Sequence, residues 1–197
     1  PHTGMIMILL PGLGFFHWNL QKRSYAAMGP AVNATISAGV NSREIIKTAA
    51  SFVLLPLVSM VSASHNAGDH VRTMQIVGTG LGLSLASGIV GQLGIFMFVK
   101  PLMSIFEGAQ PLLSNATFLM KLYCLAFPLI VLNETMMGVL AGMNEYRLVG
   151  ECLMIVVVFA LCNSTLFFMG MIDIPSTLFL VSITELLVFV MLSWNLW

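Results

Sequence analysis

Charged residues are scarce in this chain. Lysine and arginine together number 8, aspartate and glutamate number 8, and only 8% of the 197 residues are charged. A soluble domain carries about 25% charged residues, so this composition excludes an ordinary water-soluble fold. The two signs also balance, which leaves no basic or acidic field of the kind that binds nucleic acid.

Cysteine is scarce as well, and metal-binding patterns are missing. The three cysteines lie inside apolar runs, without the spacing of a zinc site or a disulfide framework: Cys124, Cys152 and Cys162. One polar segment contains His65, Asp69 and His70, but no further acid or thiol completes a ligand set there. We therefore expect no metal site and no cofactor beyond a transported proton or sodium ion.

A secretory signal is also lacking, because the first apolar run has no basic leading region and no small-residue cleavage site. The chain begins at Pro1 rather than at a methionine and ends on the apolar Trp197. We therefore expect a fragment of a longer protein.

Long hydrophobic runs are what the chain has in abundance. Hydrophobic residues make up 58% of it, and a helix that crosses a bilayer needs about 20 of them in succession. These runs are too long for the strands of a membrane barrel. The sequence predicts an all-α membrane protein with a single domain over residues 1–197. Its six transmembrane helices are expected at about 5–26, 37–63, 74–99, 117–142, 148–171 and 176–197.

Two local features refine this prediction. Polar segments predict loops between the helices at 64–73, 100–115 and 143–147, and a turn at 173–175. In the third segment, Gly80, Ser84 and Gly88 repeat every four residues. This spacing places small side chains on one face, which lets the backbone of another helix approach closely.

The polar residues inside the apolar runs are the candidate site. Asn133 and Glu134 lie in the middle of the fourth segment, and Glu185 lies in the middle of the sixth. A carboxyl group within the membrane is costly and typically lines an ion or substrate pathway. We therefore predict that these three residues line a cavity, in which a carboxylate exchanges a coupling ion. A structural pair that bonds across helices is the alternative.

Other residues support weaker alternatives. Lys47 and Lys121 are the cations available to a lipid-linked precursor flippase, which needs a cationic cavity. Ser84, in the run Gly82-Leu-Ser84, suggests an intramembrane protease, which needs a histidine base within hydrogen-bond reach. A membrane subunit without catalytic activity is a further alternative. We expect a transporter rather than an enzyme.

The end of the fourth segment carries a family resemblance. The run Gly138-Val-Leu-Ala-Gly142-Met-Asn-Glu-Tyr-Arg147 resembles a signature of the multidrug and toxic compound extrusion (MATE) family, in which a G-x-L-R-G-like helix end precedes a short polar loop. Ala141 stands where the family usually has arginine. The segment Ser64–Arg72, the glycine-rich helix after it and the Tyr123 to Pro128 region also fit, so the resemblance covers about residues 25–197.

The resemblance implies a fold and a function. MATE proteins have twelve helices in two lobes around a central cavity, so six helices correspond to one lobe. The run Ser24–Gly29 is more similar to the C-terminal lobe, particularly of plastid-type plant and algal members. In the family register the usual acidic position falls near Ile130 and Asn133 matches an amide position, while Glu134 has no counterpart.

We therefore expect a secondary antiporter that exports small organic compounds in exchange for protons or sodium. Its partners are the lipid bilayer, the organic substrate and the N-terminal lobe of the same protein. The sequence places it in a membrane as a multi-pass protein and leaves open whether that membrane belongs to a plastid, another organelle or the cell surface.

Overall fold

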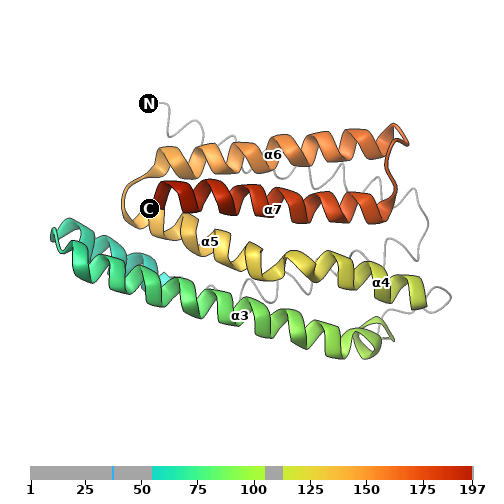
Figure 1. Ribbon diagram of the computed structural model, residues 1–197, viewed down its shortest axis with the longest axis horizontal. Helices are drawn as coiled ribbons and strands as arrows, with labels where there is room; N and C mark the ends of the chain where they lie inside the picture. The colour runs from blue at the N-terminus through green and yellow to red at the C-terminus, as the bar shows by residue number, and fades with distance from the viewer. Residues whose placement is uncertain (1–36, 38–54, 105–112, 197) are drawn as a thin grey trace.

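The computed structural model describes residue 37 and residues 55–104 and 113–196, and these residues form an all-α bundle (Figure 1). Residues 55–66 are helical and lead through a short turn into the next helix. The elements that follow are α3 (His70–Ser104), α4 (Leu113–Tyr123), the short 3₁₀ helix η2 (Cys124–Ala126), α5 (Phe127–Gly142), α6 (Tyr146–Phe168) and α7 (Ile174–Leu196).

The hairpin turns share one hydrogen-bonding pattern. After α6, Gly170 has φ +69°, its N–H donates to Phe167 O, and the N–H of Met171 donates to Leu166 O. After α5, the residue with positive φ is Asn144, and its neighbour Glu145 donates to the carbonyl of Leu140. Both are Schellman endings, in which a left-handed residue lets the chain satisfy the last carbonyls of a helix and reverse. Gly68, which also has a positive φ, ends the helix of residues 55–66 with the same hydrogen-bonding pattern.

Aspartates begin the helices after two of these turns. Asp69 Oδ1 accepts the N–H of Arg72 at 3.0 Å, and Asp173 Oδ1 accepts the N–H of Ser176 at 2.9 Å. These are N-caps, which satisfy backbone donors that a helix start leaves unpaired. The hydrogen bonds from Ser176 hold the pKa of Asp173 below its usual value. The cap of α7 therefore stabilises the fold above the ordinary aspartate pKa and is lost as the pH falls through the lowered one.

The turn after α5 provides a stability test. Asn144 has φ 67°, and the left-handed region costs most residues with a Cβ about 1–2 kcal/mol. Asn144→Ala should destabilise the protein by about 1 kcal/mol, whereas Asn144→Gly should not. Thermal unfolding of the purified protein in detergent measures both; equal losses for alanine and glycine would contradict this account of the turn.

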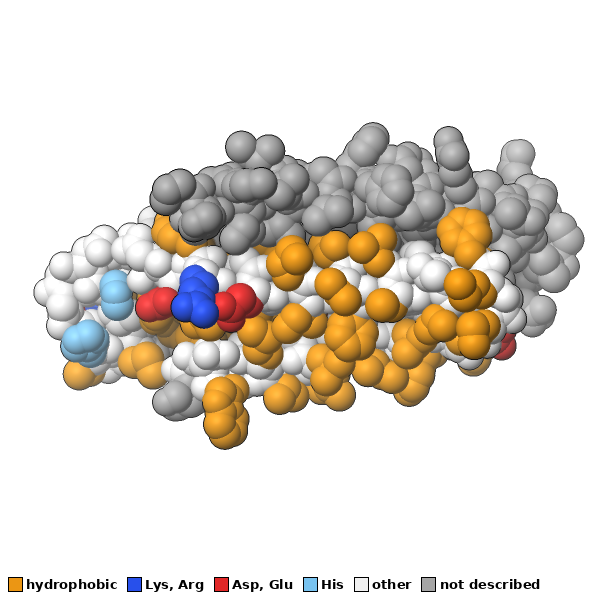
Figure 2. Space-filling model, turned by 90° about the horizontal axis from the view of Figure 1, so that it is seen from above, with side chains coloured by type: hydrophobic (Ala, Val, Ile, Leu, Met, Phe, Trp, Pro, Cys, Tyr) orange, Lys and Arg blue, Asp and Glu red, His pale blue; other side chains and the backbone are white. Residues whose placement is uncertain are grey.

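Four helices in the described part are long and apolar enough to cross a membrane: His70–Pro101, Thr117–Gly142, Tyr146–Phe168 and Pro175–Leu196. Their outward faces carry large apolar side chains, such as Met97 at 79% exposure and Val90 at 69%. Hydrophobic side chains cover much of the described part of the face shown in Figure 2, while its histidines and most of its visible charges gather towards one end. These features indicate a multi-pass integral membrane protein.

The predicted segments agree with these helices in outline. The third, fifth and sixth segments each correspond to one helix, α3, α6 and α7. The predicted loops were too long, because α3 begins at His70 and continues to Ser104, and the turn after α5 occupies only 143–145. The first segment, 5–26, and most of the second, 37–63, lie outside the described residues, so the described part holds four candidate spans rather than six.

The fourth predicted segment, 117–142, matches the candidate span Thr117–Gly142, but it is not one uniform α-helix, because η2 interrupts it between α4 and α5. Pro128 lies one turn after Cys124, and proline has no N–H to donate to the carbonyl four residues earlier. A neighbouring helix supplies a donor at the break: Gln92 Nε2 of α3 donates to the carbonyl of Leu125, the residue after Cys124, at 3.1 Å. Broken helices persist in membranes where such partners satisfy the freed backbone groups.

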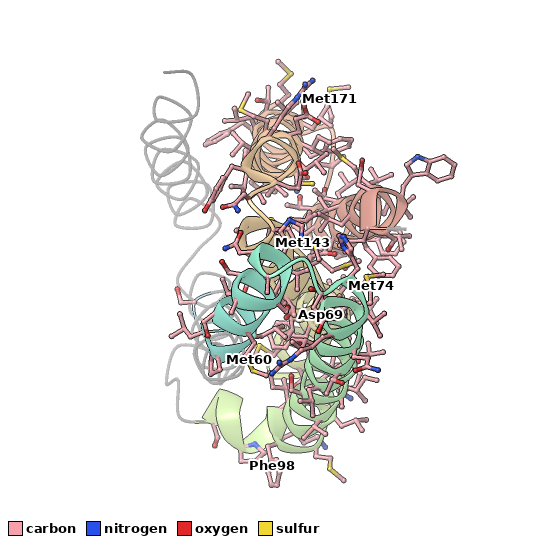
Figure 3. The ribbon with its side chains drawn as sticks, turned by 90° about the vertical axis from the view of Figure 1, so that its left-hand side faces the viewer. Met60, Asp69, Met74, Phe98, Met143 and Met171 are labelled. Carbon is pink, nitrogen blue, oxygen red and sulfur yellow. The ribbon has the colours of Figure 1, made fainter. Side chains whose placement is uncertain are left out.

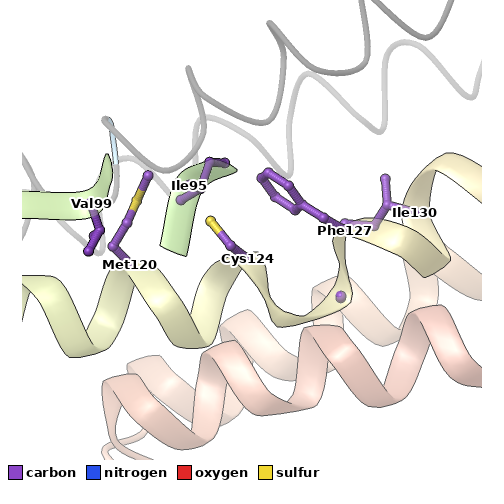
Figure 4. Close-up of a cluster of buried hydrophobic side chains, with 7 residues drawn as sticks. Ile95, Val99, Met120, Cys124, Phe127 and Ile130 are labelled. Carbon is purple, nitrogen blue, oxygen red and sulfur yellow. The ribbon is translucent and has the colours of Figure 1, made fainter. Parts of the chain in front are cut away.

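Helix α5 is the centre of the bundle. It packs against α3, α6 and α7, and ten of its sixteen residues are buried. Around the break, Met120, Cys124, Phe127 and other buried side chains of α3, α4 and α5 form one apolar cluster (Figure 4). A second cluster joins α5 to α6 and α7. The polar residues of α5 are therefore held in a packed interior.

The small-residue stripe of α3 was predicted correctly. A Cβ on Gly88 would lie 2.7 Å from Pro128 Cα, and one on Gly80 would meet the Leu57 side chain at 2.5 Å. Between them, Ser84 Oγ lies 2.7 Å from Thr135 Oγ1 of α5. The glycines therefore permit the close approach of α3 to α5 and to helix 55–66.

Candidate functional site

A buried polar pair joins α5 to α7. Asn133 Nδ2 donates to the backbone carbonyl of Glu185 at 2.8 Å and to Glu185 Oε2 at 3.0 Å. Asn133 is 1% exposed and Glu185 9%. The two residues are 52 positions apart in the chain, so only the packing of the two helices brings them together.

The orientation of the Asn133 amide follows from its partners. A backbone carbonyl and a carboxylate oxygen both accept, so the NH₂ group must face Glu185. The other amide atom, Asn133 Oδ1, is buried and has no hydrogen-bond partner among the described residues. An unsatisfied buried acceptor of this kind costs about 1–3 kcal/mol, so this oxygen has an unmet capacity for a proton donor or a cation.

Ser182 is a further oxygen-bearing side chain on this part of α7, beside Glu185. It precedes Glu185 by three residues, which places the two side chains on neighbouring positions of one helix face. Its hydroxyl oxygen is buried and also lacks a partner in the described part of the chain. Carboxylate, amide and hydroxyl oxygens are hard ligands that suit small cations and protons. The buried pair of α5 and α7 therefore combines a carboxylate with an unsatisfied amide oxygen, and a further unsatisfied hydroxyl lies one turn away on α7.

Thr135, the other buried polar residue near Asn133 on α5, anchors the opposite side of the helix. Thr135 Oγ1 lies 2.8 Å from the carbonyl of Val131 and 2.7 Å from Ser84 Oγ of α3, and all three residues are buried. Asn133 is thus fixed to α7 while Thr135, two residues later, is fixed to α3. These contacts hold α5 between its neighbours and fix the position of the Asn133 amide.

Glu134 lies between these two contacts and is half-buried. Successive residues leave an α-helix about 100° apart, so its side chain projects from a different face than that of Asn133. The structure brings Asn133 and Glu185 into direct contact. That Glu134 acts together with this pair stays a prediction.

The residues on which the flippase and protease alternatives depend do not belong to the Asn133–Glu185 pair. Lys121 is exposed on α4, and Lys47 lies outside the described residues. Ser84 is hydrogen bonded to Thr135, and in the described part His65 and His70 lie at the hairpin turn, with their rings 6.5 Å apart. Among the described residues no cluster of three metal-binding side chains occurs.

Sequence reasoning missed two parts of this arrangement. It did not single out Ser182, which reads as an ordinary small residue in an apolar run. Its spacing of three residues before Glu185 was the available signal. It also did not pair Asn133 with Glu185 specifically, because the rotation of two distant helices about their axes is not encoded in either segment alone.

Comparison with known proteins provides no further guide to the site. The chain matches no protein-family model, no curated protein sequence and no solved structure.

Proposed function

We propose that this chain is one lobe of a MATE-like secondary antiporter, which exports a small organic compound in exchange for protons or sodium. The observation that carries the proposal is the Asn133–Glu185 pair, a buried carboxylate with an unsatisfied amide oxygen beside it in a membrane-spanning bundle. Intramembrane carboxylates typically mark ion or proton pathways.

The broken helix α4–η2–α5 supports the same proposal. Secondary transporters commonly build their sites from discontinuous helices near the middle of the membrane. Here the break at Cys124–Ala126 lies about two turns before Asn133 in the same span. A change in cation occupancy at Asn133 and Glu185 would alter the attraction between α5 and α7, and α5 is also packed against α3.

The proposal includes six helices in this lobe and a second lobe contributed by the rest of the protein. The organic substrate binds between the two lobes, and alternating access arises from their rocking motion. The MATE resemblance of Gly138–Arg147 supports this architecture, and the resemblance of the run Ser24–Gly29 favours the C-terminal lobe of a plastid-type protein.

The test is counter-transport by the full-length protein in liposomes. A cationic fluorescent dye is the probe, and proton and sodium gradients are imposed separately. We expect one inward-directed ion gradient to drive export of the dye and its dissipation by an ionophore to stop export. Dye movement that depends on neither the proton gradient nor the sodium gradient would contradict the antiporter proposal.

Glu134 provides a graded prediction. Because it is half-buried rather than enclosed, Glu134→Gln should reduce ion-driven efflux but less than the same change at Glu185. Insertion should be unaffected, which membrane fractionation checks. If the Glu134→Gln variant has the same initial efflux rate as the wild type, Glu134 does not belong to the coupling site.

A further inference from the structure

A groove lies between helix 55–66 and α3 and shares no lining residue with the Asn133–Glu185 site. Its volume is about 380 Å³, within the range of pockets that hold small ligands. Apolar side chains dominate its lining, which includes Pro56, Leu57, Met60, Gln75, Thr79 and Leu83. At the floor of the groove Gly80 lies against the Leu57 side chain, which a Cβ on Gly80 would meet at 2.5 Å.

A polar pocket of about 210 Å³ adjoins this groove at the hairpin turn. The two share Met60 and Ile76, and the polar pocket is also lined by Asp69 and Arg72. Figure 3 looks onto this end of the molecule, with Met60 on helix 55–66 and Asp69 at the start of α3. Asp69 Oδ1 accepts the backbone N–H of Arg72, and in the described part of the chain no ion pair joins the Arg72 guanidinium to a carboxylate.

The dimensions match one leaflet of a bilayer. From Gln75 to Leu83 the groove follows α3 for about 12 Å, at a rise of about 1.5 Å per residue. Half of the hydrocarbon core of a bilayer is about 15 Å. The polar pocket at the turn therefore lies at headgroup depth when the apolar groove lies among the acyl chains.

We propose that this groove and pocket together bind one phospholipid whose headgroup carries both a phosphate and a primary ammonium group. The guanidinium of Arg72 binds the phosphate, for which its planar set of donors is suited. The carboxylate of Asp69 accepts from the ammonium group, and an acyl chain occupies the groove along α3. The opposite charges of the pocket favour a zwitterionic headgroup over a purely anionic one.

Native mass spectrometry of the full-length protein, stripped of lipid in detergent, tests the proposal. Phosphatidylethanolamine, phosphatidylcholine and phosphatidylglycerol are added separately. We expect phosphatidylethanolamine to bind most tightly. Phosphatidylcholine has no ammonium N–H to donate to Asp69, and phosphatidylglycerol brings a net negative charge without an ammonium group.

Charge variants identify the site. Arg72→Gln should weaken phosphatidylethanolamine binding by on the order of tenfold. Asp69→Asn keeps the helix cap but should remove the preference for phosphatidylethanolamine over phosphatidylcholine. Arg147→Gln is the matched control, because this exposed arginine lies in the first turn of α6, which starts at the same end of the bundle as α3 (Figure 1), and it lines neither cavity.

A groove-filling variant tests the acyl chain separately. Thr79→Phe should exclude the lipid without altering either charge, whereas Leu85→Phe, at an exposed position outside the groove, should not. Equal binding of the three lipids, preferential binding of phosphatidylglycerol, or no bound lipid would each overturn the proposal. The experiment does not depend on transport activity, so its outcome is separate from that of the proposed antiporter.

Discussion

Glu185→Gln should abolish ion-driven efflux while leaving the protein folded and inserted. Glutamine keeps an oxygen that accepts from Asn133 Nδ2, and the residue is nearly isosteric, so the contact between α5 and α7 persists. What is lost is the negative charge that binds a cation or a proton. Glutamine cannot take up a proton near neutral pH, and interactions with a charged group contribute about 1.5–3 kcal/mol, so proton coupling should be lost and sodium affinity should fall roughly tenfold to a hundredfold.

The matched control is Glu151→Gln. Glu151 is 43% exposed in its side chain and pairs with Arg147 on the surface of α6, and such exposed pairs contribute about 0–1 kcal/mol. Its efflux rate should equal that of the wild type in the same liposomes. A Glu185→Gln variant that keeps the wild-type dependence of efflux on pH and on sodium would remove this carboxylate from the coupling mechanism.

Gly88→Val should prevent normal assembly of the bundle. Even the Cβ of alanine at this position would lie 2.7 Å from Pro128 Cα, and the obstacle is backbone rather than a movable side chain. Overpacking of this kind costs about 1–3 kcal/mol for small additions, and the two further methyl groups of valine should raise the cost. Gly88→Ala and Gly88→Val should therefore lower the detergent melting temperature progressively.

Gly82 is the matched control on the same helix. A Cβ there would meet no atom within 4 Å, and replacing glycine by alanine in a helix gains up to about 1 kcal/mol. Gly82→Ala should leave the melting temperature unchanged or raise it. Equal behaviour of the two alanine variants would show that α3 and α5 do not cross closely at Pro128.

Much of the fold could be predicted from composition and run length alone. The apolar runs that gave 148–171 and 176–197 correspond to α6 and α7 within a few residues at each end, because few soluble structures tolerate such segments. The break at Cys124–Ala126 could not be predicted in this way. A proline in a membrane helix is compatible with either a continuous or a broken helix, and here the outcome includes a hydrogen bond from Gln92 on another helix.

The sequence singles out Asn133 and Glu185 as candidates but could not predict their contact or the nearby Ser182. The cost of polar groups in a membrane selected Asn133, Glu134 and Glu185 from the sequence. Which of them meet depends on how α5 and α7 are rotated, and that rotation is fixed by contacts such as Thr135 with Ser84. The fold therefore pairs Asn133 with Glu185, whereas the sequence order had placed Asn133 with Glu134.

The most direct test of the central claim, that the Asn133–Glu185 pair exchanges a coupling cation, is chemical labelling of Glu185. An apolar carbodiimide modifies protonated carboxyl groups within a membrane, and peptide mass spectrometry of the full-length protein quantifies the product. We predict that Glu185 is modified at low pH and protected by rising pH, by sodium ions, or by both. A Glu185 that stays unmodified at every pH, or whose modification responds to neither ion, would contradict the account.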